Sequence, residues 1–320
     1  MLRYQTIKDK AYRVLDLTSL SLDEFEQMVE PFETAFVQHM QQWTMEGKPR
    51  TGRRYSQYAN CPLPTPEDRL LFILSYLKVA HLQVAHGALF DMSQSNANKW
   101  LHVLLVVLHQ TLLDLGDAPA RHLVALAQRL ADLRQAEQPT EQASSPATPP
   151  PFYHDGSERP ITRPQDADEQ KAYYSGKKKR HTVTNVLLAD EDCTIHMLSD
   201  THEGSTHDKP IADTMPYPLP EGSELLQDLG FLGFRLSGVL ITQPHKKPRG
   251  KQLTQEQKDE NALIAHRRVR IEHIICSIKR CRIVKDTIRL WKDSVRDMVM
   301  AICCGLHNFR LRLNPWPAYQ

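Results

Sequence analysis

The sequence contains no apolar run long enough to cross a bilayer. Its best candidate, Leu101 to Leu108, is far shorter than the roughly 20 apolar residues that a membrane-spanning helix needs. The opening residues, MLRYQTIKDKAYRVL, include no unbroken apolar stretch, so we expect no secretory signal peptide. The sequence therefore predicts a cytoplasmic protein without a membrane partner.

Cysteine pairs with metal-ligand spacing are also missing. None of the six cysteines belongs to a C-x-x-C pair, so a zinc ribbon is not expected, although the chain has 15 histidines. Cys303 and Cys304 lie in an apolar segment, where they are predicted to be buried like small hydrophobic side chains. This cysteine usage agrees with a reducing compartment.

Net charge is low, at +2 for 320 residues, but the charges are unevenly distributed. The segment from His245 to Lys292 holds 14 Lys and Arg residues against five Asp and Glu residues, a local charge of +9. Such a concentration of positive charge favours a polyanionic partner. A solvated basic surface would have the same composition, so charge alone does not establish nucleic-acid binding.

The sequence predicts two regions joined by a linker. Residues 135–151, QAEQPTEQASSPATPPP, contain no apolar repeat and cannot join a core, which is typical of a linker or surface excursion. Residues 1–134 have helical patterns throughout. Residues 152–320 begin with short β-like runs and end with long helices, so we expect an α/β domain there.

A helix-turn-helix is predicted at about residues 66–115. Thr65 and Pro66 form a strong helix start, a short helix follows around residues 83–90, and Ser93 can cap the next helix. The start of that helix carries amide, hydroxyl and amino groups that can reach base edges: Gln94, Ser95, Asn96, Asn98 and Lys99. A capped amphipathic helix of any bundle shows the same pattern, and the pattern alone favours that simpler interpretation.

Three acids in the second region stand where ordered elements are expected to end or pack. Asp155 follows the apolar pair Phe152 and Tyr153 at the expected end of a short strand, and Asp228 lies where an apolar stretch meets a glycine. Further strands are expected within residues 182–188, 193–198 and 236–242. Glu272 borders an isoleucine stripe on a basic helix, where spacing alone favours a surface ion pair with Arg268.

The combination DGSERPITRP, YYSGKKKRHT, GSTHDKPIAD, LLQDLGF and RVRIEHIICSIK resembles the catalytic core of the DDE transposases of bacterial insertion sequences. Within these, it is most similar to the group related to Harbinger-type endonucleases. The resemblance covers the second half of the chain closely and the N-terminal region more loosely. By this resemblance, Asp155, Asp228 and Glu272 match the catalytic acids, and Arg268 and Lys279 match the basic members of the glutamate signature.

The resemblance implies a ribonuclease-H-like mixed sheet flanked by helices, after the all-helical DNA-binding region. It further implies that the three acids hold two Mg²⁺ (or Mn²⁺) ions, that water cuts the element's ends, and that the freed 3′-hydroxyl attacks target DNA. The partners would be double-stranded DNA at terminal inverted repeats and targets, bound by a homodimer in the bacterial nucleoid. Phosphate contacts are expected from Lys178, Lys179, Arg180, Lys246, Lys247, Arg268 and Lys279, with Arg267, Arg270, Arg280 and Arg282 beside them.

Two positions depart from the family pattern, because Ala265 and Phe231 stand where tyrosines are usual. Three alternatives therefore stay open. The chain is either an active transposase, a catalytically inactive regulator that binds specific DNA sequences, or a metal-dependent nuclease without strand transfer. The segment His207–Asp208 also matches the family, and Asp208 is the alternative to Asp228, or its assistant, as the second acid.

Overall fold

We analysed a computed structural model, which describes residues 1–136, 151–290 and 292–317. Apart from its first two residues and its last, the predicted linker lies outside these residues. The chain forms two compact units, one of Met1–Ala118 with Ile278–Asn314 and one of Pro119–Ser277 with Pro315–Gln320. The units differ from the linear division expected at residues 134 and 152, because the last helices pack with the N-terminal region.

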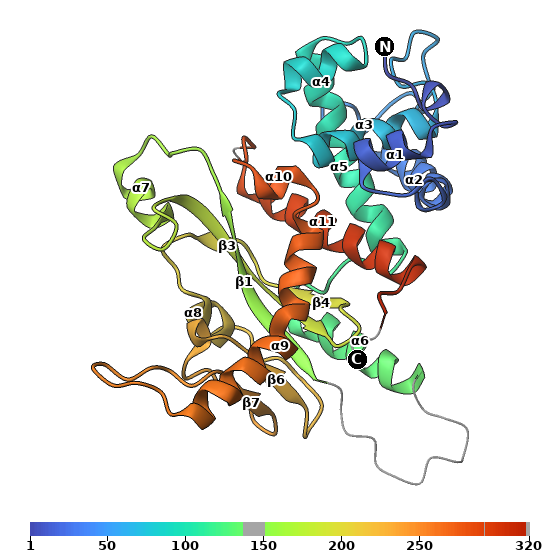
Figure 1. Cartoon of the computed structure of the whole chain (residues 1–320). Helices are drawn as coiled ribbons and strands as arrows, with labels where there is room; N and C mark the ends of the chain where they lie inside the picture. The colour runs from blue at the N-terminus through green and yellow to red at the C-terminus, as the bar shows by residue number, and fades with distance from the viewer. Residues whose placement is uncertain (137–150, 291, 318–320) are drawn as a thin grey trace. The chain divides into compact units, whose positions relative to one another are not determined.

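The second unit is built on a mixed β-sheet (Figure 1). Its central strand, β1, pairs antiparallel with β3 and parallel with β6, and β6 pairs parallel with β7. The short strands β2, β4 and β5 all pair with β3. The strands are β1 (Phe152–Pro160), β2 (Tyr174–Ser175), β3 (Arg180–Asp190), β4 (Ile195–Leu198), β5 (His202–Glu203), β6 (Glu224–Leu226) and β7 (Leu240–Thr242).

Helices flank this sheet, as the predicted ribonuclease-H-like architecture requires. They are α6 (Leu123–Ala136), α7 (Ala167–Tyr173), α8 (Asp208–Asp213) and α9 (Gln255–Ile278), with a short 3₁₀ helix, η2 (Leu229–Phe231). Apolar side chains of α6, α8 and η2 form one core with those of β1, β3, β4 and β6. On α9, the isoleucine stripe is buried at Ile271, Ile274 and Ile278, as its spacing predicts.

From its sequence, the basic segment at residues 265–284 is predicted to form one helix, and this prediction is wrong. Helix α9 ends at Ile278, and a separate short helix, α10 (Arg282–Lys285), begins after a turn of three residues. No glycine or proline marks the interruption. Local sequence therefore carries no signal for it, and Lys279 lies in the turn rather than on the helix.

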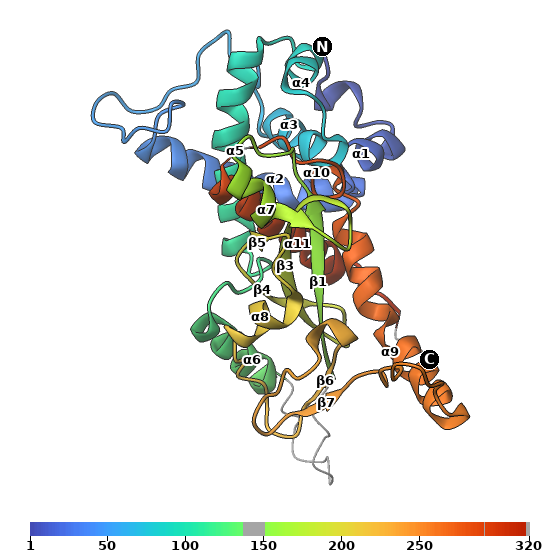
Figure 2. The same ribbon diagram turned by 90° about the vertical axis from the view of Figure 1, so that its left-hand side faces the viewer.

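The first unit is helical (Figure 2). It contains η1 (Tyr4–Thr6), α1 (Ala11–Thr18), α2 (Leu22–Gln42), α3 (Pro66–Val79), α4 (Gln83–Leu89), α5 (Gln94–Asp114), α10 and α11 (Asp293–Leu313). Thr65 and Ser93 cap α3 and α5 through their hydroxyl groups, as predicted. Helix α5 packs against α2, α4 and α11, so its buried side carries much of this core.

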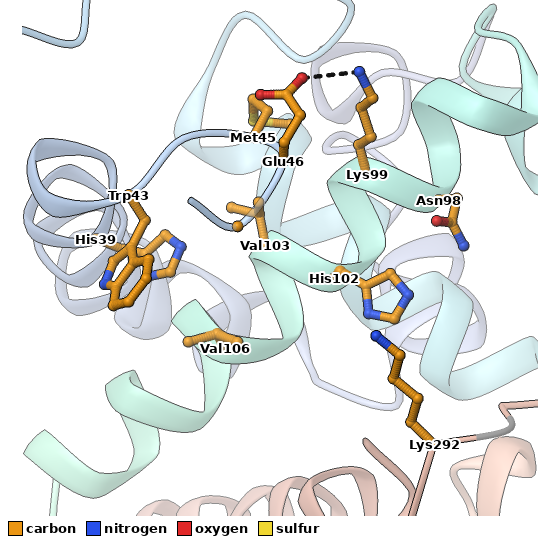
Figure 3. Close-up of a pocket in the computed structure, with 11 residues that line it drawn as sticks. His39, Trp43, Met45, Glu46, Asn98, Lys99, His102, Val103, Val106 and Lys292 are labelled. Atoms are coloured by element: carbon orange, nitrogen blue, oxygen red, sulfur yellow. Dashed lines mark hydrogen bonds and ion pairs between the residues drawn. The ribbon is translucent and has the colours of Figure 1, made fainter. Parts of the chain in front are cut away.

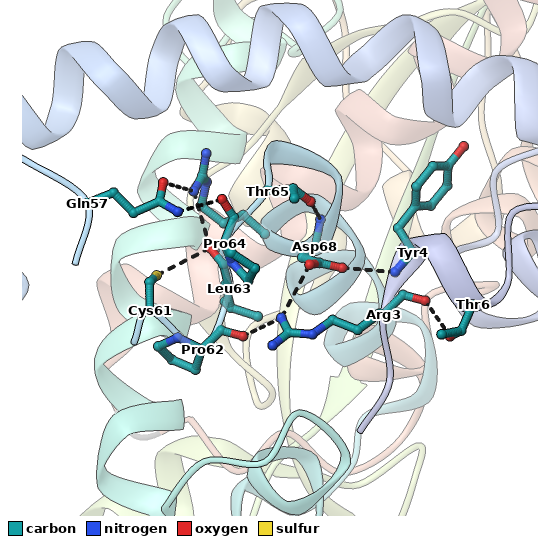
Figure 4. Close-up of polar contacts among 11 residues, drawn as sticks. Arg3, Tyr4, Thr6, Gln57, Cys61, Pro62, Leu63, Pro64, Thr65 and Asp68 are labelled. Atoms are coloured by element: carbon teal, nitrogen blue, oxygen red, sulfur yellow. Dashed lines mark hydrogen bonds and ion pairs between the residues drawn. The ribbon is translucent and has the colours of Figure 1, made fainter. Parts of the chain in front are cut away.

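The N-terminal segment is attached to the start of α3 by Asp68 (Figure 4). Its carboxylate accepts a hydrogen bond from the backbone N–H of Tyr4 at 2.9 Å and pairs with Arg3 at 3.2 Å. The backbone N–H of Asp68 in turn donates to the Thr65 hydroxyl at 3.1 Å. One capped helix start therefore fixes a segment more than 60 residues earlier in the chain.

Helices α4 and α5 are joined by the tight turn of the predicted helix-turn-helix. Gly87 of α4 lies so close to this turn that a Cβ atom there would come within 2.7 Å of the carbonyl oxygen of Met92. Asp91 takes a left-handed conformation, with φ of 58°. The turn thus depends on the close approach of the backbone to Gly87.

None of the helices in the described ranges has both the length and the apolar character that a membrane span requires.

Candidate active site

Asp155 lies in the middle of β1, not at its end as the sequence predicts. The strand continues to Pro160 because β3 pairs with it antiparallel along its whole length, with Asp155 opposite Leu187. On the other edge, the parallel pairing with β6 stops at Tyr153, which lies opposite Leu226. At Asp155, β1 is therefore still paired with β3 but no longer with β6.

Asp228 follows the end of β6 and lies beside Asp155. The strand register puts His154 next to Gln227, and the two side chains are hydrogen-bonded, with His154 Nε2 donating to Gln227 Oε1 at 3.0 Å. The next step in the same register brings Asp155 alongside Asp228. Asp228 also caps η2 by accepting a hydrogen bond from the N–H of Gly230 at 2.7 Å.

Asp208, at the start of α8, is a third carboxylate at this place. A Cβ atom on Gly156 would lie 2.0 Å from Asp208 Oδ1, so the carboxylate occupies the space beside this glycine. A Cβ atom on Gly230 would lie 3.0 Å from Asp208 Oδ2 and 2.8 Å from Asp228 Oδ1. The two glycines, each one or two residues after an aspartate, leave room for the three carboxylates to approach one another.

These carboxylates repel one another in a partly buried setting. Burial raises the pKa of Asp155 to about 6, the charge of Asp228 and then that of Asp208 add to the rise, and Arg268 opposes it. The pKa of Asp208 is raised by burial and by Asp228, whereas the nearby Lys177 lowers it. Such a group favours a cation among its members, because a positive charge would offset the repulsion.

An aromatic layer backs the aspartates. His154 is fully buried and stacks on Phe231, with ring centroids 3.8 Å apart. Burial lowers the pKa of His154 to about 3, so the imidazole is neutral and serves packing. Phe231, which replaces the tyrosine usual in the family, makes this contact with its ring face, and its side chain is fully buried.

The side chain of Glu272 is exposed on α9. The surface ion pair with Arg268 that spacing favours does not form among the described residues. Arg268 instead approaches Asp155, with Nη2 3.8 Å from Oδ2 and side chains only 13% and 18% exposed. Glu272 is one helical turn beyond Arg268 on the same side of α9, but no hydrogen bond or ion pair within the described ranges joins it to the aspartates.

The basic segments predicted to bind phosphates are exposed. Lys178, Lys179 and Arg180 are exposed in the turn into β3. They directly follow Lys177, the residue whose charge lowers the pKa of Asp208. Lys246 and Lys247 are exposed in the loop after β7. This loop is attached to α9, because the backbone N–H of His245 donates to Asn261 Oδ1 at 2.6 Å.

Besides Arg268, three of the arginines predicted to contact phosphates are engaged within the protein. Arg270 donates a hydrogen bond to the backbone carbonyl oxygen of Glu191. Arg267 forms a two-point ion pair with Glu224 of β6, which raises the pKa of its guanidinium, and Arg282 pairs with Asp286 at 2.9 Å. Arg267 therefore holds α9 against β6. Sequence spacing gave no indication that Glu224 is the partner of Arg267, since the two lie more than 40 residues apart, whereas Asp286 is four residues after Arg282.

The candidate base-reading residues lie at the start of α5. Gln94, Ser95 and Asn96 are exposed. Asn98 is half-buried and donates a hydrogen bond to Gln83 Oε1 at 3.1 Å, whereas Lys99 pairs with Glu46 at 2.9 Å. Of the five, the first three are therefore the ones whose side chains are accessible without breaking a contact with another helix or loop.

Two segments of the chain match models of known protein families. Residues 154–308 match the family model described as DDE superfamily endonuclease, and residues 61–114 match the helix-turn-helix of DDE superfamily endonuclease. The chain is similar to the probable transposase for insertion sequence element IS702 of Microchaete diplosiphon, with 29% identity over 161 residues, 50% of this chain and 56% of the relative. The chain thus spans about half the length of that relative. No solved structure matched the chain.

The two matched segments together cover more than half of the chain and contain the helix-turn-helix, both strand aspartates and Glu272. They join a DNA-binding module to a nuclease fold in one polypeptide. By its sequence and its mixed ribonuclease-H-like sheet, the chain belongs to the DDE superfamily of endonucleases, with the insertion-sequence transposases that it resembles.

Proposed function

We propose that this protein is a transposase that binds the ends of an insertion sequence, cuts their phosphodiester bonds and transfers the freed 3′-hydroxyl ends to target DNA. The observation that carries the proposal is the register of β1 and β6, which aligns Asp155 with Asp228 inside the matched endonuclease region. Catalysis is assigned to Asp155 and Asp228 with Glu272. The reaction would take place in the cytoplasm on chromosomal or plasmid DNA.

A divalent cation is the cofactor that this donor set suits. Clustered carboxylate oxygens are the ligands that Mg²⁺ and Mn²⁺ prefer, and the raised pKa of Asp155 reflects repulsion that a cation would offset. Two such ions, when bound, supply a nucleophilic water and stabilise charge on the leaving oxygen. Asp155 and Asp228 would hold them with Glu272, although no ready-made group of three ligands is present among the described side chains.

The protein's own residues would position the DNA. Arg268 beside Asp155 offsets negative charge where a phosphate must approach the carboxylates. The turn at Lys178–Arg180 and the loop at Lys246–Lys247 would bind backbone phosphates, and these contacts place a duplex without reading its sequence. Base recognition is assigned to the accessible side chains at the start of α5. This assignment is supported by the helix-turn-helix match, which includes α5, and by the way the N-terminal residues of a recognition helix contact base edges.

The exposure of Glu272 is the one observation that favours a second candidate, a catalytically inactive, transposase-derived regulator that binds specific DNA. Such a protein would keep α5 and its basic surfaces but lack a complete set of carboxylates around the cations. The two candidates differ in whether bound DNA is cut.

Incubating the purified protein with duplexes taken from the DNA that flanks its own gene tests the proposal. With Mg²⁺ present, we expect cleavage at the element's ends and joining to a second duplex, in a complex of two protein chains; without Mg²⁺, we expect binding alone. Cleavage without joining would identify a nuclease, and binding without cleavage a regulator. Absence of binding to these duplexes would contradict all three assignments.

Asp208 is proposed to assist the other aspartates, and replacing it should lower the cleavage rate. We expect Asp208→Ala to slow Mg²⁺-dependent cleavage by about 10- to 100-fold, the range typical for groups that support metal ligands. Gly156→Ala should have a similar effect, because the new methyl group would displace the Asp208 carboxylate. If the two substitutions act through the same carboxylate, the double variant Gly156→Ala, Asp208→Ala should cleave DNA no more slowly than Asp208→Ala.

Asp213→Ala, in the same helix α8 but paired with Lys209 at the surface, is the matched control and should retain the wild-type rate. Full activity of Asp208→Ala would remove this residue from the site. Additive losses in the double variant would show that Gly156→Ala acts through another route.

A further inference from the structure

A β-hairpin-like segment follows α2 and lies beside the helix assigned to base recognition. Its two sides are joined by backbone hydrogen bonds, from Thr44 N–H to Lys48 O at 2.9 Å and from Arg50 N–H to Gln42 O at 2.7 Å. Trp43 and Pro49 form an antiparallel bridge. We call residues 42–54 the hairpin segment. It precedes the region matched by the helix-turn-helix family model, which begins at residue 61.

The tip of the hairpin segment contacts α5 near the end assigned to DNA reading. Glu46 pairs with Lys99 at 2.9 Å, and a groove of about 610 Å³ lies between the two elements (Figure 3). Trp43 and His39 line one side of the groove, and His102 lies on the α5 side (Figure 3). The hairpin segment is thus a direct neighbour of the recognition helix along the helix-turn-helix surface.

Both ends of the hairpin segment are anchored, so its position does not depend on the Glu46 contact. Arg50 donates from Nε to the carbonyl oxygen of Met40 at 2.7 Å and from Nη2 to that of Trp43 at 3.1 Å. Beyond the segment, Gln57 donates to the carbonyl oxygen of Pro64 at 2.7 Å (Figure 4). Between these anchors the chain projects away from the helices (Figure 2).

The chain from the tip of the hairpin segment onward is strongly basic. Between Glu46 and Glu67 the sequence has four cations and no acid. Three of the cations, Lys48, Arg53 and Arg54, have exposed side chains, and none of them forms an ion pair within the described ranges. Unpaired, exposed cations on an anchored segment are well suited to contact a polyanion, because little side-chain or backbone order must be created on binding.

We infer that the hairpin segment is a second DNA contact, which binds backbone phosphates next to the base pairs reached by α5. The inference rests on the proposed function, since it takes α5 as the recognition helix. A helix that enters the major groove has phosphates on both flanks, and a basic segment beside its N-terminal half lies where one of these backbones would run. Glu46 opposes this contact, because it holds Lys99 and adds a negative charge at the tip.

The experiment measures affinity of the full-length protein for a duplex from the element's end, over a series of salt concentrations. The triple variant Lys48→Gln, Arg53→Gln, Arg54→Gln should bind at least about 10-fold more weakly at 0.1 M salt, with a salt slope shallower by about 3. The matched control removes three charges from the segment just before and at the start of α1, by Lys8→Gln, Lys10→Gln and Arg13→Gln. It should leave both quantities near those of the wild-type protein.

Glu46→Gln should change affinity in the opposite direction, with binding several-fold tighter, because the tip loses its negative charge while Arg50 still anchors the segment. Glu30→Gln, at an exposed position of α2, is its control. Equal affinities for the basic triple variant and its control, or no gain from Glu46→Gln, would overturn the inference while the proposed function stands. A wild-type protein that does not bind the duplex would overturn both.

Discussion

Replacing Asp155 with asparagine is expected to lower the rate of Mg²⁺-dependent DNA cleavage by about a thousandfold or more, with DNA binding unchanged. Asparagine keeps the shape of the side chain but removes the charge that a cation requires. The basic segments and α5, which are assigned to DNA binding, are left intact. Rates on a duplex from the element's end and binding constants in Ca²⁺ or without metal would measure the two effects separately.

The structure adds a second expected result for this variant. Burial and the charges of Asp228 and Asp208 raise the pKa of Asp155, so its ionised form is unfavourable in the folded protein without metal. At neutral pH the neutral amide removes that repulsion, and Asp155→Asn should unfold at an equal or higher temperature than the wild-type protein in the absence of Mg²⁺. Mg²⁺ should raise the unfolding temperature of the wild-type protein more than that of the variant.

Asp168→Asn is the matched control, since Asp168 lies on α7 with an almost fully exposed carboxylate. It should match the wild-type protein in cleavage, binding and stability. Loss of DNA binding by Asp155→Asn to the same degree as loss of cleavage would mean that Asp155 is a structural residue, and the assignment of the site to β1 would be withdrawn.

The substitution Glu272→Gln is expected to lower the cleavage rate by about a hundredfold or more, again without loss of DNA binding. Because the side chain of Glu272 is exposed, this substitution tests directly whether Glu272 belongs to the active site. Arg268, one turn earlier on α9, already reaches Asp155, so the same side of the helix faces the aspartates. We propose that Glu272 completes the carboxylate set when cations and DNA are bound.

Glu256→Gln provides the control, because Glu256 is another exposed glutamate of α9, near the start of the helix. Its cleavage rate should equal that of the wild-type protein. If Glu272→Gln also cleaves normally, α9 contributes Arg268 alone, and the site consists of aspartates from the sheet and α8. A wild-type protein that binds but never cuts would instead support the inactive regulator.

Much of the local structure could be predicted from the sequence, because it depends on short-range chemistry. Thr65 and Ser93 were recognisable as helix caps, since a hydroxyl group before an apolar repeat satisfies the free N–H groups of a first turn. The run from Thr182 to Leu188 was recognisable as a strand by its β-branched and apolar residues, and it lies within β3. These features involve residues within a few positions of one another.

The site was predicted only in part, because its geometry depends on contacts between distant segments. The alignment of Asp155 with Asp228 follows from the parallel register of β1 and β6, which no local pattern specifies. The place of Asp208 beside Gly156 depends on where α8 packs. Arg268 pairs with Asp155 rather than with its near neighbour Glu272 because α9 lies against the sheet.

The sequence by itself determined the superfamily, the helix starts, the main strands and the residue types that the chemistry needs. Tertiary structure decided which acids lie together, which arginines are held by the protein, and that the last helices join the N-terminal unit rather than the sheet. The physical reason is the distance along the chain over which the deciding contacts act. Caps, turns and strand patterns arise from neighbours along the chain, whereas a shared site requires packing that brings together residues more than 70 positions apart.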